Sequence, residues 1–236
     1  MVHLKGMEHT PLERLNKFLA LQLGISRREA DTLITKGSVA INNTTASLGA
    51  RLQPTDVVTL DGSVVGSATK HEYLLFHKPI GYVCSRRQQG DTPTIYSLLP
   101  ETLHHLKPVG RLDKDSSGII LLTNDGDFTH QMTHPSYHKQ KTYRVTLDRG
   151  LEPLHQQMIS DFGVQLEDGT SKLLLTRLSD DDRRHWQIDM HEGRNRQIRR
   201  TFAALGYTVT KLHRTQFGPY ALGDIPVGQY QVIDIS

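Results

Sequence analysis

One stretch of the sequence organises the rest of the chain: Val109-Gly110-Arg111-Leu112-Asp113-Lys114-Asp115-Ser116-Ser117-Gly118-Ile119-Ile120-Leu121-Leu122-Thr123-Asn124-Asp125-Gly126. Its short apolar run, 119–122, has the length of a buried strand, and a polar loop stands directly before it. Loops held by a rigid scaffold often carry reactive side chains. Two carboxylates, Asp113 and Asp115, stand two residues apart in this loop. The stretch therefore predicts a loop with reactive side chains at the start of a buried strand.

The same loop has two simpler interpretations. Asp and Ser side chains often hydrogen-bond the backbone of a turn, which would give the loop a purely structural role. The spacing Asp113-x-Asp115-x-Ser117-Gly118 also fits the first half of an EF-hand calcium loop. However, Asn124 stands at the twelfth position, where a bidentate Glu is needed, and strand-like residues replace the expected helix. Calcium is therefore disfavoured, and the spacing alone leaves the chemistry open.

The composition predicts a soluble globular protein. The chain has 236 residues, enough for one large or two modest domains, with 36% hydrophobic and 22% charged residues. No stretch approaches the length of a membrane span, and the first ten residues lack the pattern of a signal peptide. The single cysteine, Cys84, excludes an internal disulfide and a cysteine zinc cluster. We therefore expect a cytoplasmic, monomeric protein without membrane contact.

Positive charge is unevenly distributed along the chain. Segment 192–214 holds six Lys or Arg against one acid, and segment 136–149 holds four against one. A local excess of this kind is the electrostatic signature of a surface that binds phosphates. Charge runs are also common on ordinary solvated faces, so nucleic acid is only one interpretation of the pattern.

The first part of the chain predicts a small α-β domain. Residues 1–13 are expected to be a tail. Two helical segments follow, the second opening on the capping box Ser26-Arg27-Arg28-Glu29, and then come strand-like segments. The domain therefore spans residues 14–62, and the small and polar residues 63–71 are expected to be a linker.

This domain resembles the small RNA-binding fold first described in ribosomal protein S-four. The resemblance rests on its Arg-Leu-x-Lys-Phe-Leu opening at residue 14 and its Ser-Arg-Arg-x-Ala second helix at residue 26. It implies RNA contacts for the cations that project from the two helices, which are Arg14, Lys17, Arg27, Arg28 and Lys36. Six Lys or Arg against four acids over residues 14–62 is a modest excess, so an ordinary solvated helix pair is the alternative.

Residues 72–236 predict a second, larger domain. It opens on a strand at 73–76, a turn from Lys78 to Gly81 and a strand at 82–84. Further strand-like segments follow, with clear in-out alternation at Lys141–Leu147. Helical segments stand between some of these strands, but not in the regular order of a βαβ fold. The pattern therefore predicts an α+β fold with a largely antiparallel sheet.

A helix predicted over residues 195–205 separates its arginines into two environments. Its apolar stripe consists of Ile198, Phe202 and Leu205. Arg199 lies at the edge of that stripe, and a half-buried guanidinium needs a carboxylate or another acceptor. Arg196 and Arg200 lie on the far face, where they are free to meet phosphates. The alternative is that all three are simply solvent-facing.

Histidine spacing raises a metal site as an alternative. His130, His134 and His138 would align on a continuous helix, but Pro135 breaks that helix. No paired Cys or His-Glu pattern accompanies them. We therefore expect no metal and no cofactor.

Three motifs in fixed order carry a resemblance to the RsuA/RluB/E/F family of ribosomal RNA pseudouridine synthases. They are the loop and strand from Gly110 to Gly126, Lys141-Thr142-Tyr143, and Glu192-Gly193-Arg194-Asn195-Arg196-Gln197-Ile198-Arg199-Arg200. The likeness runs from about residue 14 to the C-terminus. Each motif is weak alone, whereas their order and spacing make the resemblance specific.

The resemblance implies a synthase domain with a mixed sheet and a central cleft. It also implies roles for named residues. Asp113 is the essential carboxylate, Tyr143 stacks on the target base, and Arg199 pairs with Asp113. The reaction detaches uracil from its glycosidic nitrogen and rejoins it to the sugar through carbon 5, without metal or redox change. The target uridine must be flipped out of folded RNA. The cations implied to neutralise phosphates are Arg111, Lys139, Lys141, Arg144, Arg194, Arg196, Arg200 and Arg214.

Other functional hypotheses remain open from the sequence. A catalytically silent RNA-binding or ribosome-assembly factor would use the front domain and the basic clusters without chemistry. A metal-dependent hydrolase would use the histidines. The sequence names neither the uridine nor the ribosomal subunit, and it does not decide between naked RNA and an assembling particle as substrate.

Overall fold

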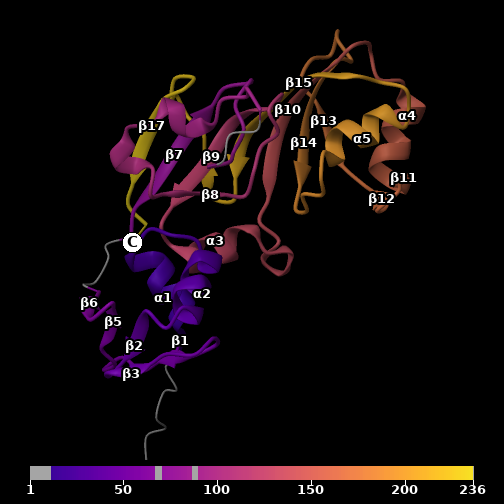
Figure 1. Ribbon diagram of the computed structural model, residues 1–236. Coiled ribbons are helices and arrows are strands. Elements are labelled where there is room, and N and C mark those ends of the chain that lie inside the picture. Colours follow the sequence, from indigo (N-terminus) through magenta and orange to yellow (C-terminus); the bar gives the residue numbers. More distant parts are fainter. Residues whose placement is uncertain (1–11, 67–70, 87–89, 236) are drawn as a thin grey trace, which may run out of the picture. The chain divides into compact units, whose positions relative to one another are not determined.

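The computed structural model describes residues 12–66, 71–86 and 90–235 (Figure 1). These residues form two compact units, divided between His71 and Glu72. Most of the predicted tail, residues 1–11, lies outside the described residues. No helix among those described combines the length and apolarity that a bilayer crossing requires.

The N-terminal unit packs two helices on a small sheet. The helices are α1 (Leu15–Gln22) and α2 (Arg27–Thr35). The strands are β1 (Glu13–Arg14), β2 (Val39–Ile41), β3 (Thr44–Thr45), β4 (Arg51–Leu52), β5 (Val58–Leu60) and β6 (Ser63–Val65). The main sheet has the order β3-β2-β5-β6, and β1 pairs with β4. Apolar side chains from both helices and from β2, β4 and β5 form its core.

The start of α2 follows from its sequence. The Ser26 hydroxyl accepts a hydrogen bond from the Glu29 backbone N–H, and the Glu29 carboxylate accepts one from the Ser26 N–H. Both bonds satisfy backbone donors that the first helical turn would leave unpaired. The predicted capping box is therefore confirmed.

The predicted linker begins too early. Ser63–Val65 forms β6, which pairs antiparallel with β5 and closes the edge of the N-terminal sheet. The Asp61-Gly62 turn has positive φ at both residues, and such a two-residue turn joins strands into a hairpin. Glu13 also belongs to a strand rather than to a tail. Residues 67–70 of the predicted linker lie outside the described part of the chain.

The C-terminal unit is built on a nine-stranded mixed sheet (Figure 1). Its strands are β7 (Tyr73–Lys78), β8 (Lys107–Val109), β9 (Ser117–Thr123), β10 (Lys141–Leu147), β13 (Leu174–Arg177), β14 (His185–Met190), β15 (Val209–Phe217), β16 (Tyr220–Ala221) and β17 (Tyr230–Ile233). The order is β13-β14-β10-β15-β9-β7-β17, with β16 paired to β15 and β8 paired to β9. A separate hairpin joins β11 (Val164–Leu166) and β12 (Gly169–Ser171).

Short helical segments cover this sheet. They are α3 (Gly126–Thr133), α4 (Pro153–Gln157), α5 (Gln197–Ala203), the 3₁₀ turns η1 (Ile95–Leu98), η2 (Glu101–Leu103) and η3 (Pro135–Tyr137), and the π-helical turn η4 (Met158–Phe162). Alternate residues of β7 and β9 enter two different cores. Leu74 and Ile120 join the larger core, whereas Leu75 and Ile119 join a smaller one. The sheet is therefore covered on both faces at its centre.

One junction in the sheet is parallel. β15 pairs parallel with β9, and every other pairing in this sheet is antiparallel, as predicted for a mixed, largely antiparallel sheet. At this junction Gly118 faces Arg214, and a Cβ on Gly118 would lie 2.1 Å from the Arg214 carbonyl oxygen. Only glycine permits this approach of the two backbones. Gly118 of the opening stretch is therefore required by packing.

Two predicted elements differ from the structure. The segment 82–84, predicted as a strand, makes only an isolated bridge from Val83 to Thr94. The helix predicted over 195–205 is shorter, because α5 starts at Gln197 and Arg196 has a left-handed backbone conformation with φ of 46°. The helical-wheel argument therefore does not apply to Arg196.

A partly buried tyrosine hydroxyl makes the stability of the C-terminal unit pH-dependent. Burial and the hydrogen bond to Asp125 raise the pKa of Tyr73 to about 12. Because the unfolded chain ionises first, near pH 10, the stability that this group contributes is complete below that pH. It falls as the pH rises towards 12. We expect the difference in free energy of unfolding between wild type and Tyr73→Phe to be constant below about pH 10 and to shrink above it. Urea unfolding across this range measures the difference, and a constant difference up to pH 12 would contradict the assignment.

Candidate active site

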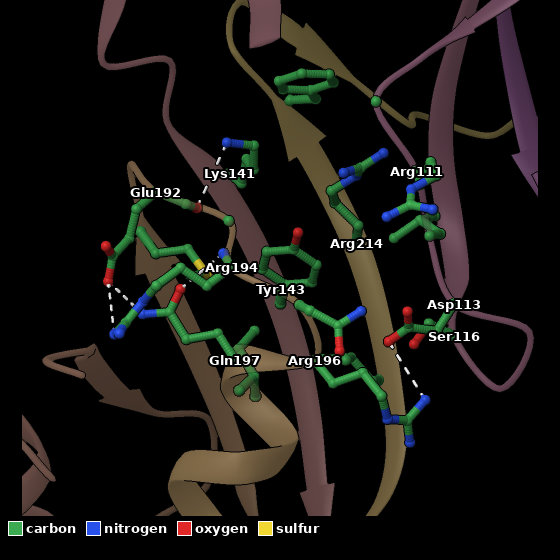
Figure 2. Close-up of a pocket in the computed structure, with 18 of the residues that line it drawn as sticks. Arg111, Asp113, Ser116, Lys141, Tyr143, Glu192, Arg194, Arg196, Gln197 and Arg214 are labelled. Carbon is green, nitrogen blue, oxygen red and sulfur yellow. Dashed lines mark hydrogen bonds and ion pairs between the residues drawn. The ribbon is translucent and has the colours of Figure 1, made fainter. Parts of the chain in front are cut away.

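A cavity of about 500 Å³ opens beside the loop that precedes β9 (Figure 2). Asp113 and Ser116 line it from this loop, and Tyr143 and Arg214 line it from the sheet. Glu192, Arg194 and Gln197 lie across the cavity, from the segment that leads into α5. The three motifs that are far apart in sequence therefore meet around one space.

Strand register brings these residues together. Tyr143 of β10 pairs with Arg214 of β15, and Arg214 pairs in turn with Gly118 of β9. This row crosses three strands and ends beside the loop that carries Asp113. A register irregularity between Thr142 and Tyr143 lies directly at the row. The cavity therefore sits where the parallel and antiparallel pairings of β15 meet.

A fully buried lysine fixes the shape of the Asp113 loop. The Lys78 ammonium donates to the carbonyl oxygens of Pro79, Asp113 and Ser116, at 2.9, 3.0 and 2.7 Å. Burial lowers the pKa of Lys78, and the three carbonyls satisfy its donors. Cys84 adds a weaker contact, because its thiol donates to the Leu112 carbonyl oxygen. Sequence reasoning placed Lys78 in a turn and missed this function.

The ion pair at the carboxylates differs from the prediction. Arg196, not Arg199, pairs with Asp113, with 3.5 Å between Nη1 and Oδ2. Arg196 also binds Asp115 through two hydrogen bonds of 2.9 Å. The left-handed conformation at Arg196 turns its side chain back towards the loop, whereas the helical pattern had placed it on the far face. The predicted pairing of Asp113 with Arg199 is therefore wrong.

Arg199 stabilises the loop that carries Asp113 through contacts with Asp115. Its side chain is 13% exposed, in line with the half-buried position predicted at the edge of the apolar stripe. It donates to the Val209 and Asp115 carbonyl oxygens, and its Nε lies 3.4 Å from the Asp115 carboxylate. The Arg196 hydrogen bonds are the main reason that the pKa of Asp115 lies below its ordinary value. Asp115 thus joins two arginines to the Asp113 loop.

Two other predicted phosphate ligands are already paired. Arg200 binds the Asp168 carboxylate at 3.0 and 2.7 Å. Arg194 binds the same carboxylate and the carbonyl oxygens of Gly169 and Thr170. Asp168 lies in the β11–β12 turn, so these ion pairs tie that hairpin to α5. The prediction that Arg200 is free to meet phosphates is wrong for this structure.

Arg214 is at the base of the cavity rather than on its surface. Its side chain is 2% exposed, its Nε donates to the Ile119 carbonyl oxygen, and its guanidinium lies 4.8 Å from the Phe217 ring. Its Nη2 is buried and has no hydrogen-bond partner among the described residues. The Ser116 hydroxyl oxygen is also buried and has no hydrogen-bond partner in the described part of the chain. Because buried polar groups are nearly always paired, both atoms point to a ligand with hydrogen-bond acceptors.

The remaining predicted cations lie around or away from the cavity. Arg111 and Lys141 line it, and the Lys141 ammonium donates to the His191 and Glu192 carbonyl oxygens. The Lys139 side chain lies close to Gly218, which follows the cavity-lining residue Phe217. Arg144 is exposed and adjacent to Tyr143, so strand alternation directs it to the opposite face of the sheet. Arg144 therefore does not belong to the cavity.

Comparison with known proteins identifies the family. The sequence profile described as RNA pseudouridylate synthase matches residues 72–204, and that of the S4 domain matches residues 13–58. This chain belongs to the RNA pseudouridylate synthase family. One relative in the family is the ribosomal small subunit pseudouridine synthase A of Pasteurella multocida, 37% identical over 92% of this chain and 94% of that protein. Another is the ribosomal large subunit pseudouridine synthase B of Bacillus subtilis, 34% identical over 87% and 86%.

A solved pseudouridylate synthase has the same fold. Its crystal structure matches with a TM-score of 0.67 and 32% identity, covering 94% of this chain and 96% of that one. The family resemblance predicted from the ordered motifs and the S-four-like opening is therefore confirmed. The cations of the S4 domain that were predicted to contact RNA are mostly exposed, namely Arg14, Arg27, Arg28 and Lys36, while Lys17 lies near Glu13.

The Asp115 carboxylate offers a test of how this pseudouridylate synthase arranges its arginines. Asp115→Asn keeps the side-chain shape but removes the charge that holds Arg196. We expect kcat to fall about tenfold, because a charge-assisted hydrogen bond contributes about 1.5–3 kcal/mol. The free energy of unfolding should change by less than about 1 kcal/mol, because the ion pair is partly exposed. Single-turnover rates and urea unfolding measure both. A wild-type rate would show that Asp115 does not position Arg196.

Proposed function

We propose that this chain isomerises a uridine of ribosomal RNA to pseudouridine, with Asp113 as the catalytic carboxylate. The relatives' names include ribosomal small-subunit and large-subunit pseudouridine synthases. The observation that carries the site assignment is the cavity itself. A partly exposed carboxylate, an aromatic side chain and two unpartnered buried polar atoms converge on a space that suits a planar base.

The proposed reaction needs only a rearrangement of bonds. The bond between C1′ of the ribose and N1 of uracil breaks, the uracil turns, and a C1′–C5 bond forms. The proton on C5 then leaves and N1 gains one, so no atom or electron is gained overall. The Asp113 carboxylate would either add covalently to the substrate or remove a proton from the sugar. The side chain, one-third exposed at the cavity wall, is open to the substrate in either case.

The cavity would receive an extruded base. Enzymes that act on a base within folded nucleic acid flip it into a pocket and hold it by stacking and hydrogen bonds. Tyr143 offers the aromatic surface, and Arg214 Nη2 and Ser116 Oγ offer donors to the two uracil carbonyl oxygens. Uracil would thus satisfy these two buried atoms, which have no hydrogen-bond partner among the described residues.

Cations around the cavity and on the S4 domain would bind the RNA backbone. Arg111, Lys139 and Lys141 are the proposed phosphate contacts near the cavity, and the S4 cations Arg14, Lys17, Arg27, Arg28 and Lys36 are proposed to dock the RNA elsewhere. Binding should weaken as the salt concentration rises, because phosphate neutralisation releases counterions. We further propose that the protein works as a monomer in the cytoplasm.

The test is direct mapping of the product. Purified protein is incubated with unmodified small-subunit and large-subunit ribosomal RNA and with precursor particles isolated from cells that lack it. We expect one new pseudouridine on one of these substrates, located by carbodiimide labelling and reverse transcription. RNA binding without a new pseudouridine on any substrate would favour a silent assembly factor instead.

A further inference from the structure

Three rings gather at the end of α3 in the catalytic unit. His130 and His134 lie nearly face to face, with ring centroids 4.7 Å apart and an interplanar angle of 35°. Tyr137 stands edge-on to both, at 5.8 and 6.4 Å. All three side chains are exposed, and Tyr137 retains 47% of its accessible surface. These three residues are here termed the ring cluster.

The backbone beneath the ring cluster is anchored. Met132, between the two histidines, is buried and packs against the backbone of Gly218. Pro135 occupies the first position of η3 and fixes its φ, and the His134 ring accepts a hydrogen bond from the Ser136 N–H. The rings are therefore held in place by their own turn. Little side-chain entropy would be lost if they bound a flat ligand.

The ring cluster lies at the rim of the active-site cavity. Thr133 and Pro135, within the same segment, line that cavity. Pro135 and His138 line a second cavity of about 650 Å³, which shares Met190, His191 and Glu192 with the first. The segment that carries the exposed rings thus contributes residues to both cavities, although the rings themselves line neither, and Lys139 follows them along the chain.

We propose that the ring cluster is a stacking platform for an unpaired base next to the target uridine. This inference rests on the proposed function, since it takes the occupant of the cavity to be a nucleotide in an RNA strand. Extruding that nucleotide disrupts the stacking of its neighbours. Single-stranded bases stack on aromatic and histidine side chains irrespective of sequence. The platform would replace the lost stacking just outside the cavity. The histidine spacing that suggested a metal site is thereby explained by ring stacking.

The experiment compares two single-stranded probes on the full chain. The first is a fluorescein-labelled twelve-nucleotide oligoadenylate, and the second is an abasic RNA of the same length, which keeps the phosphates but offers no rings. Binding is measured by fluorescence anisotropy for wild type, His134→Ala, Tyr137→Ala and the ring-retaining variants His134→Phe and Tyr137→Phe. His185→Ala, which removes an exposed histidine from β14, is the matched control.

We expect each alanine variant to bind oligoadenylate at least fivefold more weakly than wild type, because one base–ring stack contributes about 1–3 kcal/mol. Every variant should bind the abasic probe within twofold of wild type. The phenylalanine variants and the His185→Ala control should also bind oligoadenylate within twofold of wild type. Equal oligoadenylate affinity for wild type and both alanine variants would overturn the proposal. The proposal would also be overturned if the alanine variants lost as much affinity for the abasic probe as for oligoadenylate. The assay does not require catalysis, so a chain that forms no pseudouridine but shows this contrast would refute the proposed function and leave the platform standing.

Discussion

Asp113→Asn abolishes pseudouridine formation in the proposed mechanism. The amide keeps the size and hydrogen-bonding shape of the side chain but has neither the charge nor the basicity to add to the substrate or remove a proton. Groups that transfer a proton in a transition state contribute about 10²- to 10⁴-fold in rate. We therefore expect kcat to fall by a factor of at least about 10². Product mapping on ribosomal RNA and single-turnover rates measure the loss.

Controls separate this chemical effect from misfolding. The Asp113 side chain is one-third exposed and 3.5 Å from Arg196, so its loss should cost less than about 1 kcal/mol of folding free energy. Asp224→Asn removes an exposed carboxylate elsewhere in the catalytic unit and should leave the rate unchanged. If Asp113→Asn and wild type give equal yields of pseudouridine, the carboxylate is not the catalyst.

Arg214→Met is expected to lower kcat/KM about 10- to 100-fold. Methionine fills a similar volume but cannot donate to a uracil oxygen, and a hydrogen bond from a charged group contributes about 1.5–3 kcal/mol. Stability should respond in the opposite direction. A buried guanidinium with an unpartnered Nη2 is costly, and replacing such a charge by an apolar side chain is often neutral or stabilising.

The comparison of activity with stability decides what Arg214 does. If it serves the substrate, the variant unfolds at the same or higher urea concentration while kcat/KM falls. If it serves the fold, through its bond to the Ile119 carbonyl oxygen, stability and activity fall together. Arg214→Lys, which keeps the charge but loses the planar fork, should recover only part of the activity.

Local pattern in the sequence was sufficient to predict several secondary-structure elements and the type of sheet. The capping box at Ser26 predicted the start of α2, and the apolar run 119–122 predicted the buried strand β9. The largely antiparallel sheet followed from strand-like segments without regular βα order. These features depend on hydrogen bonds and side-chain alternation between residues close in the chain, which is why a single sequence expresses them.

The partners of the charged residues were not predictable in the same way. The family resemblance assigned Arg199 to Asp113, and the helical pattern left Arg196 free. A left-handed residue before α5 instead turns Arg196 onto Asp113 and Asp115. Lys78 gave no sign of its function, because its three acceptors are backbone carbonyls that exist only once the loop has folded. A backbone angle at one residue thus decided which arginine faces the carboxylates.

By itself, the sequence determined the family, the two domains and the three motifs whose residues line the cavity. Only the tertiary structure decided how those motifs meet. The parallel pairing of β15 with β9 and the register of β15 with β10 place Tyr143, Arg214 and the Asp113 loop in one row. Strand register is set by packing between segments far apart in the chain, and a shift of one residue would turn every side chain to the opposite face. The pattern along the chain therefore names the residues of the proposed site, and the sheet brings them together.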